Sequence, residues 1–337
     1  MQNSYSGSIF AIDNPRRTDM ILESITKNRI LIEADLIPAQ GDRFQPTGFA
    51  DLGAATYTLP DGTRKLLVES AQSMANRLEA TIVGPDGRCI PELEGISYVT
   101  TRLEGSDADG TVLSTLTEPH RLASPFIIAD KNFQKSFCAE SGYSARGVLD
   151  WQRIYRTIFK YDVNSLLHGV FLSIVEGGRI KVPRLISSFI EASNVREAVS
   201  GGVKNSFDPT GKIQHAECDK DVYSNVPYQR VEYTAEKITA FFNVDVAGIK
   251  GLGLGAEAQE LLVCLALYKI RALLSGGLRL RTACDLVLFG HLRIDGMDSL
   301  PGKADLLAVL QSAIQGCKPL FADPPVTTLT APATQKA

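Results

Sequence analysis

The side chains best suited to binding a phosphate backbone lie within residues 68–77, which read Val-Glu-Ser-Ala-Gln-Ser-Met-Ala-Asn-Arg. Ser70 is a residue type that caps helix N-termini, so a helix is expected from 71 to about 80. Hydroxyl, amide and guanidinium groups near the positive end of a helix dipole suit phosphates and ribose hydroxyls, although an ordinary solvated face has the same composition. Side chains four residues apart form one polar stripe on this helix: Gln72 with Asn76, and Ser73 with Arg77.

Basic residues are concentrated in residues 151–204, which contain eight Lys and Arg against four Asp and Glu in a chain of net charge −3. In Arg-Ile-Lys at 179–181 and Arg-Leu-Arg at 279–281, basic and apolar residues alternate as they do in strands. Each segment therefore places its two cations on one face. One such pair is commonly a solvated sheet edge, but together with the polar helix they favour phosphate binding. The expected electrostatic track is Arg43, Arg179, Lys181, Arg184, Lys204, Arg279 and Arg281, with a minor contribution from His168.

Enzyme motifs are scarce. Gly251-Leu-Gly-Leu-Gly-Ala256 satisfies the dinucleotide-binding pattern Gly-x-Gly-x-x-Gly/Ala, but the acid expected about 20 residues later is missing. No Walker loop, His-Glu-x-x-His or Gly-x-Ser-x-Gly occurs, and the cysteines and histidines show no metal-ligand spacing. We therefore expect no catalytic residue, metal or cofactor, and keep a dinucleotide enzyme as a minor alternative.

The composition is that of a folded soluble protein, with 337 residues, 44% hydrophobic residues and 22% charged residues. The longest apolar run, 261–267, is much shorter than the roughly 20 residues of a membrane span, and the N-terminus shows no signal-peptide pattern. Six widely spaced cysteines indicate reduced thiols rather than a disulfide framework. A cytoplasmic protein without a membrane partner is expected.

Hydrophobic periodicity and turn residues predict the elements that position these side chains. Strands are expected at 30–37, 65–69, 166–175, 238–246 and 278–289, and helices at 71–80, 151–159, 183–191 and 256–274. The expected domains are a discontinuous core of 1–80 and 151–317, an inserted irregular subdomain at 81–150, a protruding hairpin at 205–229, and a disordered tail at 318–337.

Several segments resemble the Cas-seven family, the backbone subunits of type I CRISPR interference complexes, in its type I-G (formerly I-U) branch called Csb-one. The resemblance spans most of the chain. It rests on residues 40–49, 51–55, 68–78, 119–125, 167–171, 201–204 and 277–285.

The resemblance implies an α+β fold: an RRM-like (ferredoxin-like) β-α-β-β-α-β core with an inserted finger region and a protruding thumb hairpin. Residues 81–150 and 205–229 are the candidates for finger and thumb. The segment 68–77 is similar to the wider family's Ile-Ser-Ser-Gln-Ser-Leu-Lys-Arg pattern, whose helix contacts guide RNA. Ser70, Gln72, Ser73 and Arg77 occupy comparable places, so the resemblance implies that they contact RNA. The expected strands show no aromatic pair on which bases would stack, so binding would rest on phosphates, ribose and shape.

The implied function is non-catalytic and serves antiviral defence. Several copies would polymerise head to tail along a CRISPR RNA and present it to the target DNA strand, together with other Cascade subunits: a fused Cas-five/Cas-six type subunit and a large subunit. The alternative is a type III-like backbone subunit that cuts RNA with a metal and an aspartate of the loop after the first strand. That loop contains Asp42, Asp51 and Asp61.

Overall fold

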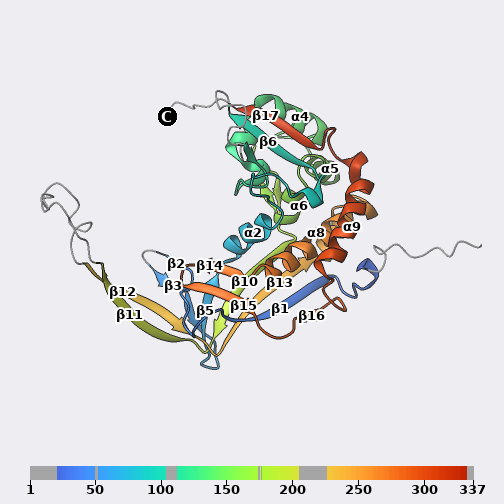
Figure 1. Cartoon of the computed structure of the whole chain (residues 1–337). Helices are drawn as coiled ribbons and strands as arrows, with labels where there is room; N and C mark the ends of the chain where they lie inside the picture. The colour runs from blue at the N-terminus through green and yellow to red at the C-terminus, as the bar shows by residue number, and fades with distance from the viewer. Residues whose placement is uncertain are drawn as a thin grey trace, which may run out of the picture.

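The computed structural model describes residues 21–49, 52–103, 112–173, 175, 177–204 and 226–331. Its lower half is a curved sheet with strand order β14-β15-β1-β13-β10-β5-β4, and β16 pairs with β1 (Figure 1). All these pairings are antiparallel. The strands are β1 (Arg29–Pro38), β4 (Thr56–Thr58), β5 (Arg64–Glu69), β10 (Ile186–Ser193), β13 (Lys237–Asp245), β14 (Leu278–Arg281), β15 (Cys284–Leu288) and β16 (Arg293–Asp295).

Alternating side chains explain why β1 forms where the sequence predicts a strand. Ile30, Ile32, Ala34 and Leu36 are buried on the face turned toward the helices, and the residues between them point to the other face. The predicted strands at 65–69 and 238–246 are confirmed with the same alternation in β5 and β13.

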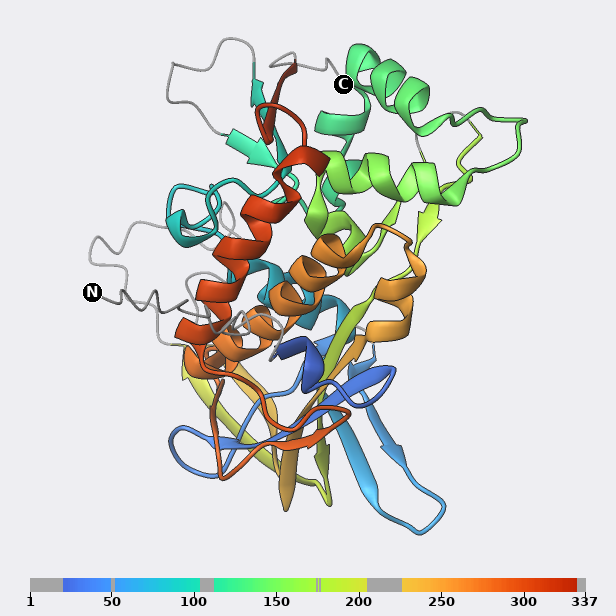
Figure 2. The same ribbon diagram turned by 90° about the vertical axis from the view of Figure 1, so that its right-hand side faces the viewer.

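Two helices, α2 (Ala71–Ala80) and α8 (Ala256–Ser275), cover one face of the sheet. The predictions of both helices are confirmed. Along the chain the elements run β1, α2, β10, β13, α8 and β15, and the four strands lie side by side in the order β15-β1-β13-β10. Helix α9 (Lys303–Cys317) packs against α8, and Figure 2 shows the two crossing between the sheet and the upper half.

The upper half contains most of the predicted insertion, and it is more regular than expected. It holds strands β6 (Tyr98–Leu103) and β7 (Val112–Ser114), turns η1 (Pro91–Leu93) and η2 (Arg121–Ala123), and helices α3 (Pro125–Ile128) and α4 (Lys131–Ser141). Helix α5 (Trp151–Tyr161), predicted at 151–159, packs on α4. There the rings of Phe133 and Tyr161 meet edge to face, with their centroids 5.0 Å apart.

The end of the described chain also belongs to this half. We expected 318–337 to be disordered, yet η3 (Lys318–Leu320) is followed by β17 (Val326–Ala331), which pairs in parallel with β6 from Tyr98 to Leu103. The expectation is wrong for 318–331, because backbone pairing with β6 orders a segment with few apolar side chains. Residues 332–337 lie outside the described residues.

Two further predictions fail between 163 and 193. The expected strand at 166–175 is instead helix α6 (Val163–His168) and the short strand β8 (Val170–Phe171), because Asp162 caps a helix by accepting from the amides of Asn164 and Ser165. The expected helix at 183–191 is β10. Its apolar residues satisfy a helical period, but Ile186, Ile190 and Ala192 also alternate, and pairing with β13 selects the strand.

Four other regions complete the fold. The predicted strand at 278–289 is a hairpin, β14 and β15, that turns at Thr282 and Ala283. Strands β2 (Gly48–Phe49) and β3 (Gly53–Ala54) pair in the loop after β1, and β8 pairs with β9 (Lys181–Val182). Helix α7 (Val246–Gly251) precedes α8.

Within the described ranges, no helix is both long enough and apolar enough to cross a bilayer.

A two-stranded ribbon, β11 (Arg196–Lys204) and β12 (Val226–Thr234), projects from one end of the sheet (Figure 1). The predicted hairpin at 205–229 overlaps the start of β12. Residues 226–229 belong to β12, and 205–225 lie outside the described residues.

The pairing of β17 with β6 yields a stability prediction. A chain ending at Ala322 loses β17 and leaves β6 with an open edge, so its melting temperature should fall by about 1 to 3 °C, as expected for a loss of roughly 1 to 2 kcal/mol in a protein of this length. A chain ending at Ala331 keeps β17 and is the control. Equal melting temperatures by differential scanning calorimetry would contradict a structural role for this strand.

Candidate nucleic-acid interface

Helix α2 presents the predicted polar stripe at its surface. The Ser70 hydroxyl accepts from the Ser73 amide at 3.3 Å and caps the helix as predicted. Gln72 and Asn76 are exposed, whereas Met74 and Leu78 are fully buried on the opposite side. The free amides of the first turn and the side chains of the stripe thus share one accessible edge.

Two of the predicted cations are used to build this edge. Arg77 donates to the Leu280 carbonyl at 2.7 Å and lies 3.8 Å from the buried Glu69 carboxylate. Arg281 pairs with the other oxygen of Glu69 and donates to the Gln45 carbonyl at 2.7 Å. Glu69 therefore ties α2, β14 and the loop after β1 together through both arginines.

Other predicted cations remain at the surface beside them. Arg279 on β14 and Arg43 in the loop after β1 are exposed and line a pocket of about 650 Å³. The same pocket contains acids: Arg43 lies 3.4 Å from Glu232, and Asp42 and Asp285 also line it. The structure brings these residues to one side of α2.

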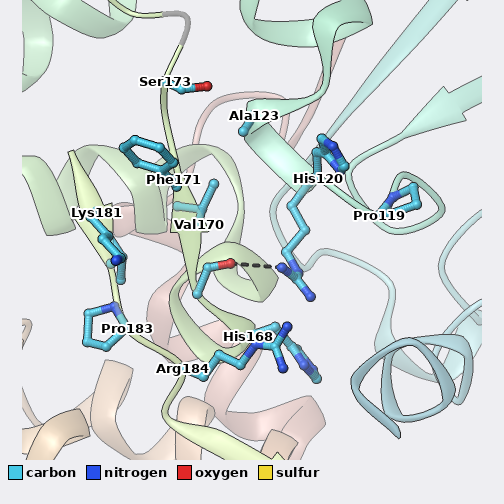
Figure 3. Close-up of a pocket in the computed structure, with 13 residues that line it drawn as sticks. Pro119, His120, Ala123, His168, Val170, Phe171, Ser173, Lys181, Pro183 and Arg184 are labelled. Atoms are coloured by element: carbon cyan, nitrogen blue, oxygen red, sulfur yellow. Dashed lines mark hydrogen bonds between the residues drawn. The ribbon is translucent and has the colours of Figure 1, made fainter. Parts of the chain in front are cut away.

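The second group lies at the N-terminal end of α2. Arg184 donates to the Ala71 carbonyl at 3.3 Å, and it lines a pocket of about 510 Å³ with Lys181 and His168 (Figure 3). The structure thus links one pocket to each end of α2, through Arg184 at Ala71 and through Arg279 at Arg77. Lys181 and Arg43 line these two pockets, and Gln72 and Asn76 lie exposed on the helix itself. We call this set the α2 track.

Besides Arg77 and Arg281, two further predicted cations lie outside the track. Arg179 donates to the carbonyls of Ala145 at 3.2 Å and Gly147 at 2.9 Å, so it braces the loop before α5. Lys204 ends β11, but its side chain lies outside what the structure describes.

Beneath α2 lies a buried polar network that the sequence analysis missed. Arg121 clamps Glu79 of α2 with Nε and Nη2 at 2.5 and 2.8 Å, and Asn164 of α6 donates to the same carboxylate at 2.8 Å. Lys269 of α8, which has no exposed surface, donates to the Asn164 side-chain oxygen and lies 2.9 Å from His168 Nε2.

Burial governs the protonation of this network. Desolvation lowers the pKa of Lys269 to about 8, with Glu79 opposing the shift, and the group remains charged at neutral pH. Desolvation and the neighbouring Lys269 and Arg121 charges hold the pKa of His168 well below its usual value, so this imidazole is neutral.

Backbone geometry shows how tightly the network is held. Arg121 adopts a left-handed φ of 54°, uncommon for a residue with a side chain, and its Nη1 donates to the Gly169 carbonyl at 2.9 Å, the dashed line in Figure 3. A Cβ at Gly169 would lie 2.9 Å from the Val182 carbonyl oxygen, so glycine lets β9 approach the end of α6. One signal in the sequence was available: a lysine, 269, inside the otherwise apolar stretch of α8.

The opposite face of the sheet overturns another expectation. The rings of Phe189 and Phe241 stack at 5.0 Å on the neighbouring strands β10 and β13. The expectation that the strands carry no aromatic pair is therefore wrong, because 183–191 was assigned to a helix. Glu33 lies opposite Phe241 in the β1–β13 register, and Glu191 follows Phe189 on the same face.

The residues of the two enzymatic alternatives are placed as follows. Asp42 is exposed, and Asp61 accepts from its neighbour Thr63 at 2.9 Å in a turn, which lowers the Asp61 pKa; Asp51 lies outside the described residues. Among the described residues no group of three or more His, Cys, Asp or Glu side chains is arranged to hold a metal. The segment from Gly251 to Gly255 joins helix α7 to helix α8, and α7 follows the antiparallel strand β13. A dinucleotide-binding loop instead joins a parallel strand directly to a helix.

One family model matches part of this chain. Residues 30–197, from β1 into β11, match the model of a family described as CRISPR-associated protein GSU0053. The match covers just under half of the chain, including α2, the insertion and the part of the buried network up to His168. No curated protein matches the chain.

Solved structures with some similarity include a chain of a CRISPR RNA-guided surveillance complex in a pre-nicking state, at 16% identity and a TM-score of 0.42, covering 79% of this chain and 77% of that one. A second chain from a CRISPR RNA-guided surveillance complex has 13% identity and a TM-score of 0.28, with 73% and 71% covered. Thermofilum pendens Csc2 has 10% identity and a TM-score of 0.30, with 93% and 81% covered.

The buried lysine yields a pH prediction. Lys269 titrates at about 8 in the folded protein and near 10.5 when unfolded, so between these values the unfolded state binds more protons and wild-type stability rises with pH. The Lys269→Met variant lacks this gain. The wild-type minus variant free energy of unfolding should therefore rise from pH 8 to pH 10, by at most about 1.4 kcal/mol per pH unit.

Urea unfolding at pH 8, 9 and 10 measures this difference, with Lys135→Met on the exposed face of α4 as the control. The control should unfold in parallel with wild type. If the wild-type minus Lys269→Met free energy of unfolding did not change with pH, burial would not have lowered the pKa of Lys269.

Arginine and glutamine in the stripe should behave differently when replaced. Arg77→Ala leaves Glu69 short of a partner and should lower the free energy of unfolding by about 2 kcal/mol. Gln72→Ala changes an exposed side chain and should stay within about 0.5 kcal/mol. Chemical denaturation of both variants tests the distinction, and an equal loss would refute the structural role of Arg77.

Proposed function

We propose that this protein is a non-catalytic, cytoplasmic backbone subunit of a type I Cascade complex, of the type I-G kind, and that it binds CRISPR RNA along the α2 track. The observation that carries this proposal is the accessible edge of α2, flanked by exposed Arg184 and Arg279. This edge belongs to the segment that matches a CRISPR-associated family.

The chemistry of the track suits a guide of any sequence. Gln72 and Asn76 offer amide donors and acceptors for ribose hydroxyls, and the amides of the first helical turn favour a phosphate. Arg43, Lys181, Arg184 and Arg279 add positive charge without reading bases. Sequence selection would then be left to pairing between the guide and the target DNA strand.

The outer face of the sheet suits RNA less well, despite its stacked phenylalanines. The cations described on that face are paired with acids: Arg29 with Asp245, Lys65 with Glu191, Lys237 with Asp35, and Arg293 with Glu33 and Asp35. Little net positive charge remains for phosphates, so we place the guide on the side of α2.

The proposal extends to architecture and partners. The strand order β15-β1-β13-β10 with α2 and α8 on one face supports an RRM-like core. The ribbon β11–β12 would serve as the thumb, in contact with the guide. Copies would follow one another head to tail, with a fused Cas-five/Cas-six type subunit and a large subunit completing the assembly.

A second candidate is a metal-dependent endoribonuclease of the type III kind. The observation that favours it is Asp42, which is exposed in the loop after β1 and lines the 650 Å³ pocket with Glu232 and Asp285. Carboxylates are ligands that Mg²⁺ prefers, although no three of them among the described residues are arranged to hold a metal.

Co-expression with a CRISPR array and the neighbouring complex subunits tests the proposal. The purified complex should carry RNA of uniform length that contains spacer sequence, seen in the 260/280 nm ratio and by sequencing. Arg279→Glu should weaken RNA binding and lower the slope of log affinity against log salt by about 1, whereas Lys135→Glu on the exposed face of α4 should leave both near wild type.

Nucleic-acid-free complexes, or equal losses in the two charge-reversal variants, would contradict the proposed track. Metal-dependent cleavage of a complementary RNA that disappears in Asp42→Ala would instead support the endoribonuclease.

A further inference from the structure

The pocket of about 510 Å³ beside α2 has an unusual lining. Proline, valine and the half-exposed ring of Phe171 form its apolar part (Figure 3). Apart from Ser173, its polar side chains carry nitrogen: His120, Arg121, His168, Lys181 and Arg184. None of the lining residues is an aspartate or a glutamate. This composition separates the pocket from the acid-containing pocket around Arg43.

Hydrogen bonding fixes which nitrogen of His168 carries the proton. The Lys269 ammonium group only donates, and it lies 2.9 Å from His168 Nε2. Nε2 must therefore accept, which leaves the proton of the neutral ring on Nδ1. The lysine acts as a positioning residue for the tautomer.

The resulting Nδ1–H has no acceptor. His168 is completely buried, and its Nδ1 is one of the few buried side-chain atoms of the described chain without a hydrogen-bond partner. A buried donor left unpaired destabilises the folded protein, so an occupant that supplies an acceptor would recover that free energy.

The cations of the pocket differ in how many of their nitrogens already donate hydrogen bonds within the protein. All three nitrogens of Arg121 are engaged, by Glu79 and by the Gly169 carbonyl. Arg184 uses only Nη1, toward the Ala71 carbonyl, and Lys181 is exposed. Arg184 and Lys181 are thus available to an anion on the same side as His168.

We propose that this pocket binds a phosphate group, which accepts from His168 Nδ1–H and is held by Arg184 and Lys181. Phosphate supplies several acceptor oxygens with negative charge, which an acid-free lining with a fixed donor favours. The volume leaves room for the groups that the phosphate carries, and Phe171 offers them an aromatic surface.

The phosphate has two sources: the backbone of a bound RNA, which rests on the proposed function, or a free phosphate compound. The first test uses the full chain without nucleic acid and inorganic phosphate as the probe, so it does not depend on RNA binding. At constant ionic strength, phosphate should raise the melting temperature of wild type.

Variants separate this pocket from the rest of the α2 track. Lys181→Gln and Arg184→Gln should each weaken phosphate binding about tenfold, the loss of one charge-assisted hydrogen bond. Arg279→Gln should keep the wild-type response to phosphate while still weakening RNA. No phosphate response in folded wild type, or an equal loss in all three variants, would overturn the proposal.

Nitrogen-15 NMR of histidine-labelled protein tests the donor directly, without a variant that disturbs the buried network. The His168 ring should show a protonated Nδ1 and an unprotonated Nε2, with a change in the Nδ1 shift on addition of phosphate. A proton on Nε2 would overturn the proposed donor.

Competition identifies the source. If loading RNA displaces phosphate, the pocket holds a phosphate of the backbone. If phosphate binds equally well to the RNA complex, or if RNA does not bind at all, the phosphate site stands on its own and serves a free phosphate compound.

Discussion

The buried ion pair between Arg121 and Glu79 is the constraint on which the upper and lower halves of the molecule depend. Glu79 comes from the helix that covers the sheet and Arg121 from the inserted region, and Asn164 and Lys269 join the same network from α6 and α8. Charges without exposed surface are tolerated only with full partners, since an unpaired one costs several kcal/mol. The insertion can therefore take up few positions relative to α2.

A second constraint operates at the surface of α2. Residue type alone does not distinguish an arginine that holds the protein together from one that is free to meet a ligand. Arg77 and Arg281 share the buried Glu69, whereas Arg279, between them in space and sequence, is exposed. The structural arginines fix the path of β14, and that path places the exposed one beside the polar stripe.

Local signals were sufficient for the elements that end in clear caps or alternate cleanly. The strands β5 and β1 and helix α2 with its cap Ser70 follow from short runs of adjacent residues, and α8 follows from one continuous apolar helical stretch. Two errors lie where tertiary pairing decides: β10 carries a helical period but pairs with β13, and β17 is ordered by β6. A third error, at α6, is local, because the cap Asp162 was overlooked. The polar stripe was predictable because one helix carries it. The buried network was not, since four separate segments assemble it.

The parallel pairing of β17 with β6 bears on the order in which this chain folds. Tyr98 and Val326 are adjacent in that sheet although most of the sequence separates them. During synthesis from the N-terminus, the sheet of α2 and its strands can form while β6 still lacks its neighbour. The upper half is thus the last to close, and until then an unprotected strand edge is exposed on the nascent chain.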